Sequence, residues 1–260
     1  MTPDELFGLR GRVAVVTGAT GRLGQVMAGA LAGAGATTYL VGRDQARLDA
    51  LAAKLGDHTR PARCDVTADD DVAALGARLR DEQGRVDVVV HNAHVGRGGS
   101  LRTSRTADYL EAADLALGAF QRLLDATRDL LTAAAADGSP SMINVASMYG
   151  LVSPKPQLYD TPEAGNPPYY GAVKAGLVQL TRYAAVELGP AGIRVNCVTP
   201  GPFPGEGGDP ALLGRLAQQT PLGRVGDPAE IATTVLYLAS PRSSYVTGTN
   251  VVVDGGWTAW

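Results

Sequence analysis

Short apolar runs alternate along the chain with segments whose apolar residues recur every three or four positions. The first run covers residues 13–16, and Leu23, Met27 and Leu31 follow it at helical spacing. Further apolar runs cover residues 38–41, 60–64, 86–90, 142–145, 193–198 and 251–253. Strands that alternate with helices predict a parallel sheet covered on both faces. We therefore expect an α/β fold with a doubly wound, seven-stranded parallel sheet of the Rossmann type.

The helical segments differ in length and regularity. Residues 107–136 predict a long helix that is broken or bent at some point, and residues 170–188 predict another helix. Asp227-Pro-Ala-Glu230 predicts a capped start for a helix that reaches Ala239. Residues 151–168 are rich in proline and predict an ordered loop at the mouth of a site. Because no linker or repeat interrupts the pattern, we expect a single domain over residues 1–260.

Composition narrows the class of protein. The 260 residues are 45% hydrophobic and 19% charged, with a net charge of −3, which predicts a globular chain without a basic face for nucleic acid. Cys64 and Cys197 are isolated thiols, which we expect to be reduced and buried, and no metal site is predicted. The N-terminus lacks a signal-peptide pattern, and no apolar run reaches membrane-spanning length. These features predict a cytoplasmic protein with neither nucleic-acid nor membrane partners.

A glycine-rich turn separates the first predicted strand from the first predicted helix. It reads Thr17-Gly-Ala-Thr-Gly-Arg-Leu-Gly24. Glycines at this place let backbone N–H groups approach a pyrophosphate at a helix N-terminus. A tight turn without a ligand is the simpler reading, but the strand before and the helix after favour a dinucleotide site.

Three polar residues in the second half of the chain predict the chemistry. Tyr170 and Lys174 are four residues apart and therefore share one face of a helix, and Ser147 follows the apolar run 142–145. The pair alone would also suit an amphipathic surface helix. Together with a nicotinamide site, it predicts a tyrosine that moves a proton, a lysine whose charge lowers the tyrosine pKa, and a serine that holds the substrate oxygen. Tyr169 lacks a lysine four residues later.

The chain resembles the short-chain dehydrogenase/reductase family over nearly its whole length. Gly18 and Gly24 match the first and last glycines of the family's turn, whereas Arg22 replaces the middle one and Gly21 stands one residue earlier. Ser147, Tyr170 and Lys174 match the catalytic residues, and residues 194–201, 221–224 and 253–256 are similar to later motifs. The resemblance implies that the cofactor contacts Gly18, Thr20, Gly21, Arg22, Leu23, Gly24, Arg43, Asp44, Asp65, Val66, Asn92, Ala93, Tyr170, Lys174, Pro200, Gly201 and Phe203.

The end of the second predicted strand bears on the choice of cofactor. Gly42 stands where NAD-dependent relatives carry an aspartate, and Arg43 follows it. An arginine can bind the 2′-phosphate of NADP, so NADP(H) is favoured. Asp44 keeps NAD(H) open as the alternative, unless its carboxylate only caps the next helix.

Two positions depart from the family pattern. His91-Asn-Ala-His94 replaces Asn-Asn-Ala-Gly, and Leu115 stands where the family carries an asparagine of a proton relay. We expect His94 either to replace part of that relay and contact the substrate or simply to fill space. The substrate candidates are His94, Ser147 and Met148. The loop cations Arg97, Arg102, Arg105 and Lys155 are either contacts for an anionic substrate or solvated charges.

These observations predict an NAD(P)H-dependent oxidoreductase that acts on a small polar carbonyl or secondary alcohol. Three segments resemble sugar-acid or polyol oxidoreductases: 147–150, 166–168 and 257–260. The alternatives are a dehydratase or epimerase without net redox turnover, and a catalytically impaired regulatory protein. The resemblance also implies a homotetramer or homodimer. We expect residues 207–219 to form a mobile substrate lid.

Overall fold

The strands of the computed structural model form one parallel sheet, and the structure describes residues 1–205, 207 and 209–260. The strand order is β3-β2-β1-β4-β5-β6-β7, which confirms the predicted doubly wound sheet. Chain order reverses direction between β1 and β4, and ligands of such sheets bind in the crevice at that point. The strands are β1 (Val13–Thr17), β2 (Thr37–Gly42), β3 (Thr59–Arg63), β4 (Val88–His91), β5 (Ser141–Val145), β6 (Arg194–Pro200) and β7 (Asn250–Val253).

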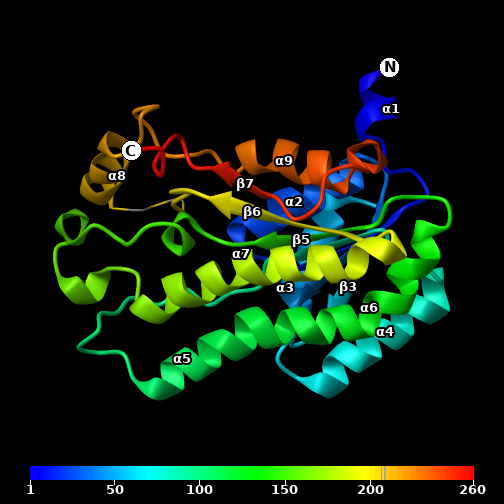
Figure 1. The fold of residues 1–260 in the computed structure, drawn as a ribbon, viewed down its shortest axis with the longest axis horizontal. Coiled ribbons are helices and arrows are strands. Elements are labelled where there is room, and N and C mark those ends of the chain that lie inside the picture. The colour runs from blue at the N-terminus through cyan, green and yellow to red at the C-terminus, as the bar shows by residue number, and fades with distance from the viewer. Residues whose placement is uncertain (206, 208) are drawn as a thin grey trace.

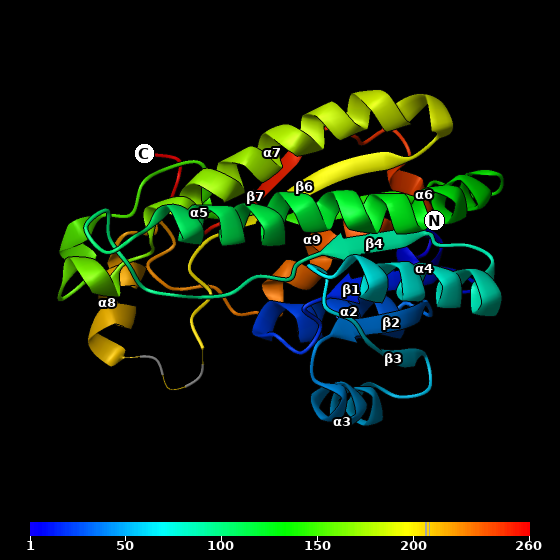
Figure 2. The same ribbon diagram turned by 90° about the horizontal axis from the view of Figure 1, so that it is seen from below.

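Helices cover both faces of the sheet (Figures 1 and 2). Side chains alternate along β1, so that Val13 and Val15 join the core under α4, α6 and α7, whereas Ala14 and Val16 join the core under α2, α3 and α9. The helices are α1 (Pro3–Phe7), α2 (Arg22–Gly33), α3 (Gln45–Leu55), α4 (Asp69–Gln83), α5 (Thr106–Ala113), α6 (Ala119–Ala135), α7 (Pro168–Leu188), α8 (Pro210–Gln218) and α9 (Glu230–Ala239).

The predicted break in the long middle helix is a π-helical turn. It spans Asp114–Gly118 and joins α5 to α6. The Nε2 atom of buried His91 lies 2.9 Å from the carbonyl oxygen of Ala116 in this turn. Because a carbonyl oxygen only accepts, Nε2 must carry the proton. The turn is thereby held against the end of β4.

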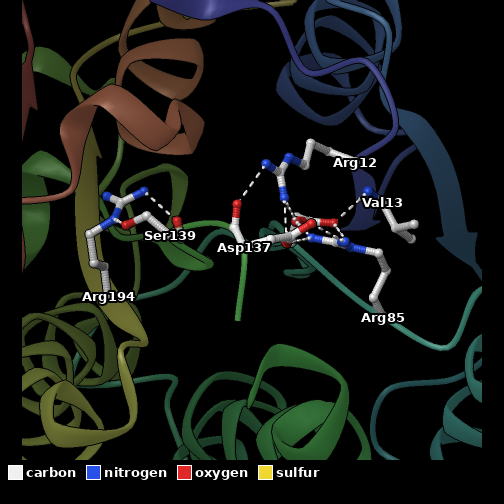
Figure 3. Close-up of polar contacts among 7 residues, drawn as sticks. Arg12, Val13, Arg85, Asp137, Ser139 and Arg194 are labelled. Atoms are coloured by element: carbon white, nitrogen blue, oxygen red, sulfur yellow. Dashed lines mark hydrogen bonds and ion pairs between the residues drawn. The ribbon is translucent and has the colours of Figure 1, made fainter. Parts of the chain in front are cut away.

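A network of arginines and aspartates holds the starts of the central strands. Asp87, which is 5% exposed, accepts hydrogen bonds from the Val13 N–H at 2.9 Å, from Arg12 at 3.1 Å and from Arg85 at 2.8 Å. Figure 3 shows Arg12 and Arg85 both reaching Asp137, which precedes β5. The buried carboxylate therefore ties β1 to β4 at the edge opposite the predicted site.

The proline-rich loop, α8 and the C-terminal segment lie at one end of the molecule (Figure 1). They share an apolar cluster, and Tyr170 packs against it. The buried members of this cluster are Met148, Tyr149, Leu158, Leu216 and Trp257. The loop is therefore packed against α8 and the C-terminal segment.

Two element boundaries bear on the sequence predictions. The predicted capped start at residues 227–230 is confirmed, because the Asp227 carboxylate accepts from the Ala229 N–H, the Glu230 carboxylate accepts from the Asp227 N–H, and α9 begins at Glu230. The expected lid contains α8, whose first turn is capped by Asp209, while residue 208 lies outside the described residues. No helix in the described part of the chain is long and apolar enough to cross a membrane.

We expect Asp87→Ala to lower the free energy of unfolding by about 3 kcal/mol, because it leaves the buried Val13 N–H without its acceptor and removes the buried one of the two carboxylates that Arg12 and Arg85 share. Asp137→Ala is the matched control, since this carboxylate is 63% exposed and its ion pairs should contribute less than about 1 kcal/mol. Urea unfolding of both variants measures the difference. Equal losses would show that the buried position of Asp87 is irrelevant.

Candidate active site

A cleft with an empty volume of about 1380 Å³, open to solvent, lies at the carboxyl ends of the central strands. Most of the predicted cofactor residues line it. They are Gly18, Thr20, Gly21, Arg22, Leu23, Gly24, Arg43, Asp65, Val66, Asn92 and Ala93, together with the substrate candidate His94. The sheet thus brings together segments from the first 94 residues of the chain.

The glycine turn has a shape that side chains cannot take. Gly18 has φ +61°, and a Cβ atom at Gly24 would lie 2.1 Å from the carbonyl oxygen of Gly18. Gly21 stands at the N-cap of α2 and has no side chain to bond the N–H groups of the first turn. Such a helix start can receive an anion. The cradle therefore fits the pyrophosphate of a dinucleotide.

Side-chain hydrogen bonds fix the turn against β4. The Thr17 hydroxyl accepts from the N–H groups of Asn92 and Ala93 at 3.0 and 3.1 Å. The Asn92 amide donates in return to the carbonyl oxygens of Thr17 and Gly18. These bonds join the ends of β1 and β4 on either side of the crevice.

Two arginines line the cleft where β2 ends and α3 begins. Asp44 caps α3 through a 3.1 Å bond from the Arg47 N–H, so its carboxylate is engaged in the manner of a helix cap. Arg43 and Arg47 both line the cleft, and Arg47 Nη2 donates to the Thr20 carbonyl oxygen at 3.1 Å. Sequence reasoning missed Arg47, although its position four residues after Arg43 at a helix start was a usable signal. Hydrogen bonds from Thr67 hold the pKa of Asp65 below its usual range.

Ser147, Tyr170 and Lys174 meet where β5 ends and α7 begins. Ser147 caps a short 3₁₀ turn by accepting from the Tyr149 N–H at 3.2 Å. Tyr170 lies in the first turn of α7, and Lys174 follows one turn later. Lys174 Nζ donates to the Val145 carbonyl oxygen at 2.7 Å and lies 5.8 Å from the centre of the Tyr170 ring.

Burial dominates the electrostatics of these groups. It raises the pKa of Tyr170, and only the hydrogen bond with Ser147 opposes it. Burial also lowers the pKa of Lys174 to about 8. Lys174 is not among the causes of the Tyr170 pKa shift, and its ammonium group donates to the Val145 carbonyl oxygen.

A second cavity lies beside Tyr170, between α5 and α7. It is lined by His94, Leu115 and Lys174 among others. The His94 ring is 6.1 Å from the Tyr170 ring, and enclosure in the cleft, followed by the charges of Lys174 and Arg22, lowers its pKa to about 4. His94 is therefore neutral near pH 7.

The remaining predicted residues lie outside the main cleft. Met148 is buried in the apolar cluster, and Pro200 ends β6. A Cβ at Gly201 would lie 2.5 Å from the Asp254 Cα. The ring of Phe203 packs on Gly226 and lines a different cavity. Within the described residues, no group of three or more His, Cys, Asp and Glu side chains could hold a metal ion.

Known proteins resemble the chain over nearly its whole length. The family model described as enoyl-(acyl carrier protein) reductase matches residues 18–258. A Sinorhizobium fredii protein named an uncharacterized short-chain type dehydrogenase/reductase is 35% identical over 95% of the chain. The chain belongs to the short-chain dehydrogenase/reductase family. It spans only 44% of that relative's own length.

Other members of the family match from end to end. Galactitol 2-dehydrogenase (L-tagatose-forming) of Cereibacter sphaeroides is 32% identical over 98% of both chains. Cis-4-hydroxycyclohexanecarboxylate dehydrogenase of Sinomonas cyclohexanicum is 35% identical over 95% of this chain and 97% of its own. The RhlG/NADP active-site complex of Pseudomonas aeruginosa has 29% identity and a TM-score of 0.87, with 99% and 100% of the chains covered. The chain is thus an oxidoreductase of a family that acts on alcohols and ketones with NAD(P).

We expect the stability of the protein to depend on pH through Lys174. Its pKa falls from 10.5 to about 8 on folding, so between these values the unfolded chain holds a proton that the folded chain has lost. Stability contributed by this group therefore rises with pH across that window. Relative to Lys174→Met, the wild-type protein should gain up to about 3 kcal/mol between about pH 7 and pH 10.5. Urea unfolding of both proteins measures this, and a constant difference across the range would contradict it.

Proposed function

We propose that the protein is an NADPH-dependent ketoreductase for a small polar carbonyl compound. The observation that carries the proposal is the meeting of Ser147, Tyr170 and Lys174 at the end of β5, beside the cleft that fits a dinucleotide. A phenol, a hydroxyl and an ammonium group close together are the parts needed to hold a carbonyl oxygen and protonate it.

Each residue has a distinct role in this proposal. When NADPH is bound, its nicotinamide supplies the hydride. Ser147 donates a hydrogen bond that positions the substrate oxygen, and the Tyr170 phenol transfers its proton to that oxygen. The raised pKa of Tyr170 keeps the phenol protonated, which suits an acid in the direction of reduction. Lys174 reprotonates the tyrosine, since a pKa of about 8 makes its proton easy to release near neutral pH.

Arg43 and Arg47 support NADP(H) over NAD(H). Both guanidinium groups line the cleft, and Gly42 at the end of β2 has no carboxylate that could bind a ribose diol. Arginine recognises phosphate through paired, charge-assisted hydrogen bonds. Asp44 is the acidic reader that NAD(H) would need, but its carboxylate caps α3. The solved RhlG neighbour holds NADP.

The proposal extends to the substrate class, the cellular location and the oligomeric state of the protein. The named relatives act on a polyol and on a hydroxycyclohexanecarboxylate, which supports a small polar carbonyl or alcohol. His94 and Met148 are the further substrate contacts in this reading. We also propose that the protein is cytoplasmic and that it forms a homotetramer or homodimer. The assembly is supported by two apolar side chains of α7 that are largely exposed, Tyr183 at 66% and Val186 at 80%.

We expect Tyr170→Phe to lower kcat by at least about a hundredfold, because it removes the proton donor, and to leave NADPH affinity nearly unchanged, because Tyr170 is one of many expected cofactor contacts. Consumption of NADPH with a panel of sugar-like and cyclic ketones measures turnover, and nicotinamide fluorescence measures binding. His94→Ala in the same assay separates a substrate contact from a space-filling role. Tight NADPH binding without consumption by any ketone would instead favour the regulatory or the non-redox alternative.

We expect Arg43→Ser to reduce the preference for NADPH over NADH by about tenfold to a hundredfold, since it removes one charge-assisted contact with the 2′-phosphate. Fluorescence titration with both cofactors gives the ratio of dissociation constants. Arg63→Ser, at the end of the neighbouring strand, is the control for a general loss of positive charge. An unchanged ratio in Arg43→Ser, or a wild-type protein that binds NADH more tightly, would assign the cofactor choice elsewhere.

A further inference from the structure

Lys155 is a half-buried cation whose contacts are all neutral in the described part of the chain. Its Nζ donates to Oε1 of Gln219 at 2.6 Å and lies 5.7 Å from the centre of the Trp257 ring. None of the carboxylates that the structure describes forms an ion pair with it. An ammonium group has three donors, and a partly buried charge is usually paired. The site therefore has donors available for an anion.

The neighbouring tryptophan places Lys155 beside the apolar cluster. Lys155 Nζ lies over the face of the Trp257 ring, and this side chain is 2% exposed. The Trp257 Nε1 atom is enclosed and has no acceptor among the described residues, so the available donors belong to Lys155. The acceptor that Lys155 does have is the neutral amide oxygen of Gln219.

These residues belong to the substrate end of the site. Trp257 and Met148 are members of the apolar cluster against which Tyr170 packs. Gln219 follows α8 directly, and Figure 1 shows α8 and the C-terminus at the same end of the molecule as the start of α7. The other loop cations differ, because Arg97 forms a two-armed ion pair with Glu111, and Arg102 and Arg105 are exposed.

We propose that Lys155 binds a carboxylate of the substrate, and that the Gln219 amide oxygen holds this place until the substrate arrives. A carboxylate accepts charge-assisted hydrogen bonds from an ammonium group, which are stronger than the bond to a neutral amide oxygen. The substrates are then oxo and hydroxy carboxylic acids rather than neutral ketones. This inference rests on the proposed function only for the step at the carbonyl group, because anion binding at Lys155 does not require turnover.

The kinetic test compares 4-oxocyclohexanecarboxylate with its carboxamide, which has the same shape and no charge. We expect the wild-type protein to prefer the acid, and Lys155→Met to lower the acid-to-amide ratio of kcat/KM by about tenfold to a hundredfold, mainly through KM for the acid. Lys155→Arg should keep most of the preference. Arg102→Met removes an exposed cation of a nearby loop and should leave the ratio unchanged. A ratio that does not change in Lys155→Met would overturn the proposal.

A binding test gives a readout that does not depend on turnover. In a Trp260→Phe background the emission comes from Trp257 alone, since the chain has two tryptophans. We expect cyclohexanecarboxylate to change this emission with saturation, and both Lys155→Met and Gln219→Glu to weaken that binding at least about tenfold. Gln219→Glu keeps Lys155 but supplies a competing carboxylate, so it controls for loss of folding.

The two tests separate the two proposals. Binding of the acid that depends on Lys155, without reduction of either ketone, would support the carboxylate site and count against the proposed reductase. Reduction of both ketones at equal rates would support the reductase and overturn the carboxylate site. Acid binding that is absent, or that is equal in all variants, would also overturn it.

Discussion

The crevice between β1 and β4 depends on these two strands being held together at both of their ends. At the starting edge, the buried Asp87 carboxylate bonds the Val13 N–H and two arginines. At the finishing edge, Thr17 and Asn92 exchange side-chain and backbone hydrogen bonds. The turn between β1 and α2 can consist largely of glycine, without side chains that cap the helix, because the two neighbouring strands are fixed. The bonds at the finishing edge lie within the site, whereas those at the starting edge hold the same two strands from the opposite edge of the sheet.

The sequence was sufficient to predict the sheet because each strand is a short apolar run followed by a helical period. The strands and their parallel direction are confirmed, with boundaries that move by one or two residues, and so is the break in the helix predicted over residues 107–136. The start of α9 is also confirmed, since Asp227 and Glu230 form the predicted cap. The exact end of each element depends on loop geometry, which periodicity does not encode.

The site could be predicted only where the residues themselves carry the chemistry. The glycine turn and the Tyr170–Lys174 pair are visible as spacing, so their position in the structure follows from the strand order. The direction of the Lys174 ammonium group was not predictable, because it depends on how α7 packs against the Val145 carbonyl group at the end of β5. The neighbours of Lys155 come from residues 64 and 102 positions later in the chain, and only packing of the loop against α8 and the C-terminal segment brings them together.

The π-helical turn at Asp114–Gly118 has a geometric consequence for the cavity beside Tyr170. A π turn holds one residue more than the α-helix around it, and one residue corresponds to a rotation of about 100°. The faces of α5 and α6 are therefore out of phase, so that α6 directs Phe120 and Leu123 into the core while α5, without a fully buried residue, turns Asp108 and Glu111 to the cavity. The cavity wall is set by the number of residues in this segment as well as by their identity. A relative with a single deletion in this turn would line the cavity with other residues of α5 while keeping the counterparts of Ser147, Tyr170 and Lys174.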